Sequence, residues 1–143
     1  MKTTARNQFP GKIRGVETGP VTTEAVIEIA GGHEITATLT TASARRLKLH
    51  VGQEALALIK ASSVVLVTDA GGYLLSARNQ LAGTVSRVAR GAVSTIVGLA
   101  LPGGEVVTAT VTNDAADALG LKAGQDATAI FKAYQVFVAV KPA

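Results

Sequence analysis

The chain has 143 residues, a formal net charge of +4 and no cysteine. Without cysteine it can form neither disulfides nor thiolate metal sites, and it has no cysteine nucleophile. The N-terminal stretch MKTTARNQFPGK lacks the apolar core of a signal peptide. The apolar run ALALIKASSVVLV is too short to cross a bilayer and is interrupted by Lys60. We therefore expect a cytoplasmic protein that does not associate with a membrane.

A repeat divides the chain into two parts. The segment ARNQ at residues 5–8 recurs at residues 77–80, and the offset of 72 residues then holds without a gap to the end. A tandem duplication with this period indicates two copies of one structural module. We expect a first domain over residues 1–70 and a second over residues 71–143. A module of this size has a small core, so support from its sister or from further chains is expected.

The elements of the first repeat can be taken in chain order. Apolar and polar residues alternate with period two in three segments separated by glycine-rich turns, which predicts three strands. These segments are GKIRGVETG, VTTEAVIEIAGG and HEITATLT. A short helix follows, capped by Thr40 or Thr41, and its counterpart in the second repeat begins at Asn113. The segments EALALIKA and VVLVTD then predict two more strands.

Each repeat is therefore predicted to run strand, strand, strand, helix, strand, strand. This is the order of a small OB-type barrel, although other five-stranded barrels remain open. The fold class is all-β with one short helix per repeat, as two tandem OB-like five-stranded β-barrels.

No catalytic constellation is found in the sequence. The two histidines, His33 and His50, correspond to Glu105 and Lys122 in the other repeat, so neither belongs to the duplicated pattern. Both are expected to be solvent-facing turn residues. Nucleophile elbows, Walker loops and zinc-ligand spacings are absent. We expect no enzyme, no catalytic cofactor and no metal held directly by protein ligands.

Binding of single-stranded nucleic acid is an alternative that the aromatic residues do not favour. OB folds bind single strands by stacking bases on aromatic side chains along a basic groove. No position is aromatic in both repeats of this chain; the aromatic residues are Phe9, Tyr73, Phe131, Tyr134 and Phe137. The sequence therefore provides no duplicated stacking platform.

The polar side chains that recur in the two repeats can all donate hydrogen bonds. They include Arg6 with Arg78, Asn7 with Asn79, Lys60 with Lys132, and Thr40 with Thr112. A set of cations, hydroxyls and backbone N–H groups without a carboxylate suits a tetrahedral oxyanion. Each also has a structural alternative: a lysine can snorkel, an arginine can pair with a carboxylate, and a threonine can simply cap a helix.

The segments TARNQFPGKI and SARNQLAGTV, followed by IKAS and FKAY, resemble the Mop domain, and the whole chain resembles a molbindin with two tandem Mop domains. The resemblance implies OB-like barrels assembled around a three-fold axis, so that a two-domain chain forms a homotrimer. It also implies molybdate as the bound ligand, with tungstate bound similarly, and a role in molybdenum storage or homeostasis without enzymatic activity. An anion-sensing adaptor module is a further alternative.

The resemblance also assigns residues to an interface site. One wall consists of Thr4, Ala5, Arg6, Asn7, Lys60 and Ala61, and again of Ser76, Ala77, Arg78, Asn79, Lys132 and Ala133. The opposite wall consists of helix-start hydroxyls on a neighbouring domain, matched by Thr40, Ser43 and Thr112. Ala115 replaces the serine in the second repeat, where Asn113 could compensate, and Tyr134 could crowd the pocket. Axial sites are matched by Val21, Thr22, Val93 and Ser94.

Overall fold

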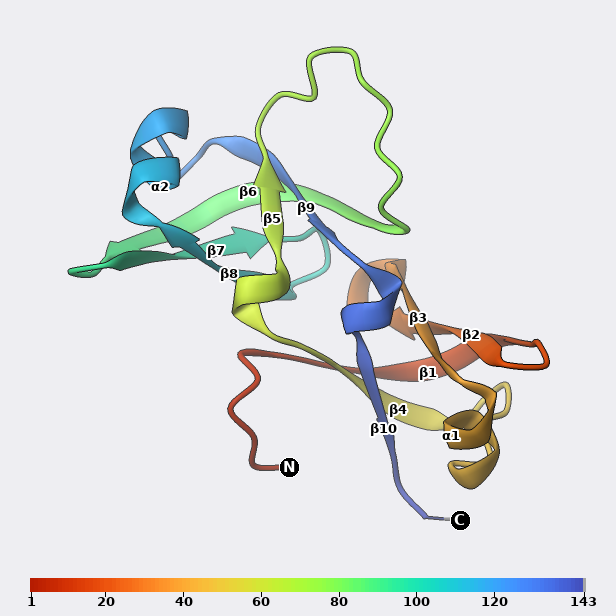
Figure 1. The fold of residues 1–143 in the computed structure, drawn as a ribbon. Helices are drawn as coiled ribbons and strands as arrows, with labels where there is room; N and C mark the ends of the chain where they lie inside the picture. The colour runs from red at the N-terminus through yellow and green to blue at the C-terminus, as the bar shows by residue number, and fades with distance from the viewer. Residues whose placement is uncertain (143) are drawn as a thin grey trace.

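The computed structural model describes residues 1–142 and contains two five-stranded antiparallel sheets, each accompanied by one short α-helix (Figure 1). The elements of the first repeat are β1 (Asn7–Thr18), β2 (Thr22–Ile29), the 3-10 turn η1 (Ala30–Gly32), β3 (Glu34–Thr40), α1 (Thr41–Arg46), β4 (Glu54–Ile59), η2 (Ala61–Ser63) and β5 (Val65–Val67). Those of the second are β6 (Asn79–Arg90), β7 (Ser94–Ala100), β8 (Val106–Thr112), α2 (Asn113–Leu119), β9 (Asp126–Phe131), η3 (Ala133–Gln135) and β10 (Phe137–Val140).

The predicted element order and fold class are confirmed. In β2 every second side chain is buried, as the period-two pattern requires. One detail of the prediction is wrong: Lys60 and Lys132 do not interrupt strands. β4 ends at Ile59 and β9 ends at Phe131, so each lysine instead precedes a 3-10 turn.

The fifth strands are exchanged between the two halves. β5 pairs with β9, and β10 pairs with β4, so the strand orders are β10-β4-β1-β2-β3 and β5-β9-β6-β7-β8. Figure 1 shows β10 running beside β4 among the first-repeat strands and β5 lying among those of the second. The division at residue 70 therefore describes the sequence repeats, whereas each sheet is built from both of them.

This exchange joins the two small cores into one. Val64 and Leu66, at the start of the exchanged β5 segment, are 3% and 7% exposed, and Val136 before β10 is 5% exposed. They belong to the same buried cluster as Ile13 and Val85 from the two long strands. The support that each module was expected to need is therefore supplied by its sister.

Two asparagines also join the halves. The side chain of Asn79 accepts a hydrogen bond from Thr36 N at 2.8 Å and donates one to Thr36 O at 2.9 Å. Asn7 makes the same pair of bonds with Thr108, at 2.7 and 2.9 Å, and donates a further bond to Ile59 O at 3.1 Å. Both asparagines are only 1% exposed, and their bonds satisfy backbone groups of Thr36, which is buried, and of Thr108, which is half-buried.

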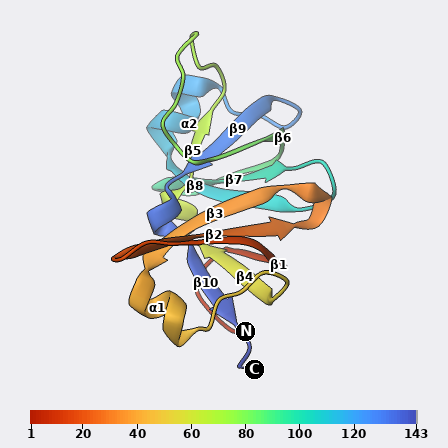
Figure 2. The same ribbon diagram turned by 90° about the vertical axis from the view of Figure 1, so that its right-hand side faces the viewer.

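The two Gly-Gly turns pack against each other at the junction. A Cβ added to Gly103 would lie 2.4 Å from the Cα of Gly31, and both glycines have positive φ, +101° and +85°. Figure 2 shows the two sheets stacked, with α2 and α1 at opposite ends. His33 is half-buried here, with Nε2 at 2.6 Å from Pro102 O, so it faces solvent only in part, whereas His50 is exposed.

Candidate functional site

Two clefts lie where the halves meet, and every repeat position that lines the smaller cleft also lines the larger one. The larger cleft has a volume of about 900 Å³ and is lined by Ser76, Ala77, Lys132, Ala133 and Thr38, among others. The smaller has a volume of about 520 Å³ and is lined by Thr4, Ala5, Lys60, Ala61 and Thr110, among others. We call them the Lys132 cleft and the Lys60 cleft. The duplication thus extends from the sequence to a pair of equivalent concave surfaces.

The strand exchange explains why residues from both repeats line each cleft. The turn η3 lies against β3, and η2 lies against β8, as each chain segment crosses from one sheet to the other. Within these turns Ala133 and Ala61 are buried, whereas the preceding Lys132 and Lys60 are exposed. Each turn therefore fixes a lysine at the edge of a cleft whose opposite side comes from the other repeat.

The residues of the recurring ARNQ segments have different roles in the structure. The asparagines are clasps between the halves, and because their amide groups are buried and already paired, their side chains are unsuited to bind an anion. Gln80 donates to Ala77 O at 2.9 Å and Gln8 donates to Ala5 O at 3.3 Å, which holds the small residues of each cleft in place. The arginines remain exposed.

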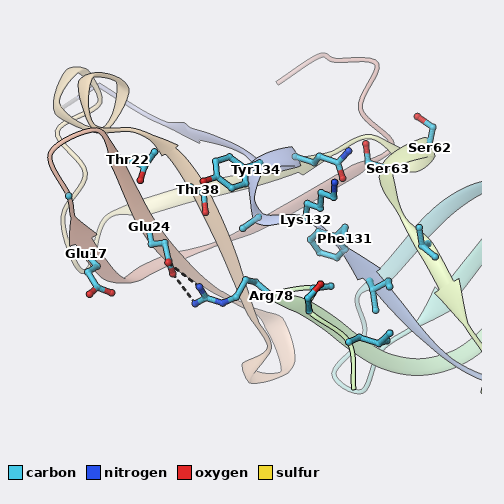
Figure 3. Close-up of a pocket in the computed structure, with 18 of the residues that line it drawn as sticks. Glu17, Thr22, Glu24, Thr38, Ser62, Ser63, Arg78, Phe131, Lys132 and Tyr134 are labelled. Carbon is cyan, nitrogen blue, oxygen red and sulfur yellow. Dashed lines mark hydrogen bonds and ion pairs between the residues drawn. The ribbon is translucent and has the colours of Figure 1, made fainter. Parts of the chain in front are cut away.

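The two arginines have different surroundings. Arg78 forms a two-pronged ion pair with Glu24, with N–O distances of 2.8 and 3.0 Å (Figure 3). The hydrogen bond and charge of Glu24 raise the pKa of Arg78, with a smaller contribution from Glu17. Arg6 has no carboxylate within ion-pair distance in the part of the chain described, residues 1–142. The structural alternative considered for the arginines, pairing with a carboxylate, is thus confirmed for Arg78.

The Lys132 cleft also contains acidic residues, which the recurring pattern did not predict. Glu17 and Glu24 both line it, and neither has an acidic counterpart in the other repeat. Figure 3 shows the guanidinium of Arg78 turned toward Glu24, with the Lys132 side chain ending apart from it. Tyr134 lines the same cleft and is 72% exposed, where the Lys60 cleft has the smaller Ser62.

The helix-start hydroxyls lie outside both clefts. Thr40 caps α1, where its hydroxyl accepts from Ser43 N at 3.1 Å and donates to the Ser43 hydroxyl at 2.9 Å. Thr112 caps α2 by accepting from Ala115 N at 3.1 Å. Within one chain these threonines therefore act as N-caps, the alternative noted from the sequence.

The loops before β2 and β7 are each tied to the first residue of a helix by a side-chain hydrogen bond, from Thr41 to Gly19 O and from Asn113 to Gly91 O. Asn113 donates to Gly91 O at 3.0 Å and accepts from the Thr95 hydroxyl at 2.7 Å. Its side chain is therefore engaged in anchoring the loop and does not replace the missing serine hydroxyl. Val93 in this loop is 83% exposed, and Val21 in the corresponding loop is 73% exposed. Thr22 and Ser94 begin the strands that follow these loops.

The fold and clefts define a tandem pair of interlocked OB-like domains with a donor-bearing cleft at each junction. The chain belongs to the TOBE domain family, which matches residues 3–66 and 75–138. This match confirms the tandem architecture expected of a two-domain molbindin.

Three similar proteins have informative descriptions. The molybdenum transport protein ModE of Herbaspirillum seropedicae is 64% identical over 141 residues, which cover 99% of this chain and 52% of that protein. The molybdenum-pterin-binding protein MopA of Rhodobacter capsulatus is 39% identical, covering 98% of this chain and 53% of MopA. The chain thus spans about half the length of the curated relatives it matches. A molybdate-bound crystal structure of ModG, a cytoplasmic molybdate-binding protein, superposes with a TM-score of 0.95 at 45% identity, covering 99% of this chain and all of that one.

Residues 1–142 contain neither a cluster of metal-binding side chains nor a helix that could span a membrane. Over residues 1–142 there is no group of three or more histidine, aspartate or glutamate side chains arranged to hold a metal ion. None of the described helices is long and apolar enough to cross a membrane.

Proposed function

We propose that the chain binds molybdate at the Lys60 and Lys132 clefts and serves in molybdenum storage or homeostasis in the cytoplasm. The observation that carries this proposal is that every lining position of the Lys60 cleft recurs in the Lys132 cleft, each cleft with an exposed lysine. The high similarity to ModG, whose structure contains molybdate, supports the choice of anion.

The donors at the clefts suit an oxyanion that only accepts hydrogen bonds. The lysine ammonium groups and the hydroxyls of Thr4 and Ser76 donate, and a dianion gains charge-assisted bonds from the lysines. A protonated phosphate would place its hydroxyl against donors, which costs free energy when no acceptor is available. Molybdate and tungstate share charge and shape, so we propose that both bind. Discrimination against sulfate then depends on the size of the assembled site.

We further propose that the chain functions as a homotrimer. The exposed valines at corresponding loop tips, Val21 and Val93, offer apolar surface at equivalent positions. A second corresponding pair, Val65 and Phe137, is 56% and 62% exposed. Association through such surfaces would bring the Thr40 and Thr112 helix starts of one protomer toward the clefts of another, where their hydroxyls would complete the sites. The loops with Thr22 and Ser94 would then lie near the axis.

A binding role without catalysis and without nucleic acid is part of this proposal. Two of the five aromatic residues, Phe9 and Phe131, are buried in the core at 3% exposure each. The exposed aromatic residues, Tyr73, Tyr134 and Phe137, all lie in the second repeat and have no aromatic counterpart in the first, so they offer no repeated surface for stacked bases.

The test is native mass spectrometry and calorimetric titration with molybdate, with sulfate as the control anion. We expect an oligomer that takes up molybdate, ignores sulfate at the same concentration, and loses uptake when Lys60 and Lys132 are both changed to alanine. Lys122→Ala is the matched control, because Lys122 is an exposed lysine that lines neither cleft. If the double variant bound molybdate as well as the unaltered chain does, the proposed sites would be wrong.

A sensing role is the second candidate, and one observation favours it. Relatives described as ModE transcriptional regulators, among them that of Yersinia pestis at 38% identity, match this chain over about half of their length. If molybdate sensing is the role, a partner protein or domain should bind this chain only when molybdate is present. Pull-down from an extract with and without molybdate, followed by identification of the captured protein, distinguishes sensing from storage.

A further inference from the structure

The two clefts share a backbone frame but differ in charge. The Lys132 cleft contains two cations, Arg78 and Lys132, and two carboxylates, Glu17 and Glu24. Among residues 1–142, the charged residue that lines the Lys60 cleft is Lys60, and no carboxylate side chain lines this cleft. An approaching dianion therefore meets a positive surface at one cleft and a balanced one at the other.

Two pairs of repeat positions account for the carboxylates, and the first pair is Glu24 and Ile96. Glu24 on β2 lies opposite Thr38 on β3, and Thr38 lines the Lys132 cleft. At the corresponding place Ile96 on β7 lies opposite Thr110 on β8, and Thr110 lines the Lys60 cleft. Residues directly opposite one another in a sheet share a face, so Ile96 occupies the place in its half that Glu24 occupies in the other.

A second carboxylate beside Glu24 makes the loss of its ion pair with Arg78 unfavourable. Glu17 on β1 lies directly opposite Glu24, so two carboxylates face each other across the ladder, and Arg78 compensates them. In the other half the corresponding pair is Ala89 and Ile96. If Arg78 turned from Glu24 to an anion, the two carboxylates would be left uncompensated beside a dianion.

We propose that the two clefts are inequivalent anion sites, in which Glu24 lowers the affinity of the Lys132 cleft by holding Arg78 and repelling the dianion. The Lys60 cleft then fills first, and the Lys132 cleft fills at a higher anion concentration. A chain with two such affinities buffers its anion over a wider range of concentration than one with two equal sites. This inference rests on the proposed function and deepens it by assigning an affinity-setting residue.

The experiment exchanges the residues that the two repeats already have at this position. Glu24→Ile gives the Lys132 cleft the side chain of the other half, and Ile96→Glu does the reverse. Both positions are half-buried, and each repeat folds with the residue that is being introduced into the other. Glu24→Gln removes the charge with little change of shape and serves if an exchanged variant does not fold. Titration calorimetry with molybdate gives the affinities, and Lys60→Ala and Lys132→Ala assign each class to its cleft.

For the unaltered chain we expect two classes of site, the tighter one lost in Lys60→Ala. Glu24→Ile should tighten the weaker class about tenfold, and Ile96→Glu should weaken the tighter class by a similar factor, which is the scale of one charge acting on a dianion a few ångströms away in water. A single class of equal sites in the unaltered chain would overturn the inference and leave the proposed function standing. An unchanged or lower affinity in both Glu24→Ile and Glu24→Gln would also overturn it, since Glu24 would then be neutral or would position Arg78 as a ligand. A chain that binds no molybdate at all would overturn both.

Discussion

The Lys60 cleft and the Lys132 cleft differ in their charged linings while the frame behind them is the same. The asparagine clasps, the glutamines that hold the small residues, and the lysine turns all have counterparts at the same offset. Glu17, Glu24 and Tyr134 have no counterparts of the same kind. Positions that hold the two halves together are alike in the two repeats, whereas these three positions that face the Lys132 cleft differ. The following predictions test this division, starting with the frame.

The largest effect is expected from breaking an asparagine clasp. Asn7→Ala and Asn79→Ala each leave a backbone N–H and C=O of the opposite half without partners, at the half-buried Thr108 and the buried Thr36, which should lower the free energy of unfolding by about 2–4 kcal/mol. Asn7 makes one more hydrogen bond, to Ile59 O, so its replacement should cost more. Urea unfolding followed by circular dichroism measures both.

Gln8→Ala is the matched control for the clasp, because Gln8 is an exposed neighbour with one long side-chain hydrogen bond of 3.3 Å. Its replacement should change the stability by less than about 0.5 kcal/mol. Equal losses in the control and in the asparagine variants would contradict the clasp, because the loss would then reflect only the start of the strand.

A smaller effect is expected where the two Gly-Gly turns touch. A side chain at Gly103 would collide with the backbone of Gly31 and would also sit at a φ of +101°. Gly104 has a similar φ of +107° but open space around it, so Gly104→Ala isolates the backbone strain. We expect Gly103→Ala to destabilise the chain by roughly 1–3 kcal/mol and Gly104→Ala by about 1 kcal/mol. If thermal unfolding showed the same loss for both, the turns would not be in contact.

The fold was predictable from the sequence to the extent that its signals are local. The period-two strands, the helix caps and the repeat register are all visible in the chain, and the structure confirms them. The exchange of β5 and β10 was not predictable, because an exchanged strand has the same neighbours in sequence and the same apolar pattern as one that stays in its own sheet. The choice depends on whether Val64 and Val136 reach their own core or that of the sister.

The candidate site was predictable only in part for a related reason. Recurrence located the lysine turns and the small residues, which line the clefts. It also selected Asn7 and Asn79, because a residue that recurs to join two halves cannot be distinguished in sequence from one that recurs to bind a ligand. Glu24 was missed for the opposite reason: it stands in one repeat only, and its link to Arg78 spans 54 residues of chain.

The helix caps come next in expected size and separate a structural role from a binding one. Thr40→Ala and Thr112→Ala each remove the acceptor for the N–H three residues on, at a cost of about 1 kcal/mol. Thr40 also bonds to the hydroxyl of Ser43, whereas the corresponding residue of the second repeat is Ala115. Ala115→Ser therefore introduces the same pair of hydroxyls into the second repeat. If the N-terminal residues of the helices complete binding sites in an oligomer, Ala115→Ser should raise the affinity for molybdate without raising the midpoint temperature of unfolding. A change in the midpoint alone would limit these threonines to capping.

The smallest effect on stability is expected from removing the ion pair between Arg78 and Glu24, the feature that most distinguishes the two clefts. The side chains of Arg78 and Glu24 are 58% and 33% exposed, so water and salt screen their ion pair, and Arg78→Ala should scarcely move the midpoint of unfolding. The pKa of Arg78 is raised above an already high ordinary value. The stability that the Arg78 charge contributes is therefore fully present below the ordinary pKa of arginine. It is lost only as the pH rises through the higher pKa of the folded state, so the titration of Arg78 adds no pH dependence of stability between about pH 6 and 10. Arg6→Ala, which removes an arginine that has no carboxylate partner among residues 1–142, is the matched control in the other half. A large loss of stability in Arg78→Ala but not in Arg6→Ala would show that the ion pair holds the halves together. The ion pair would then help to join the two halves, as the asparagine clasps do, although it occurs in one repeat only.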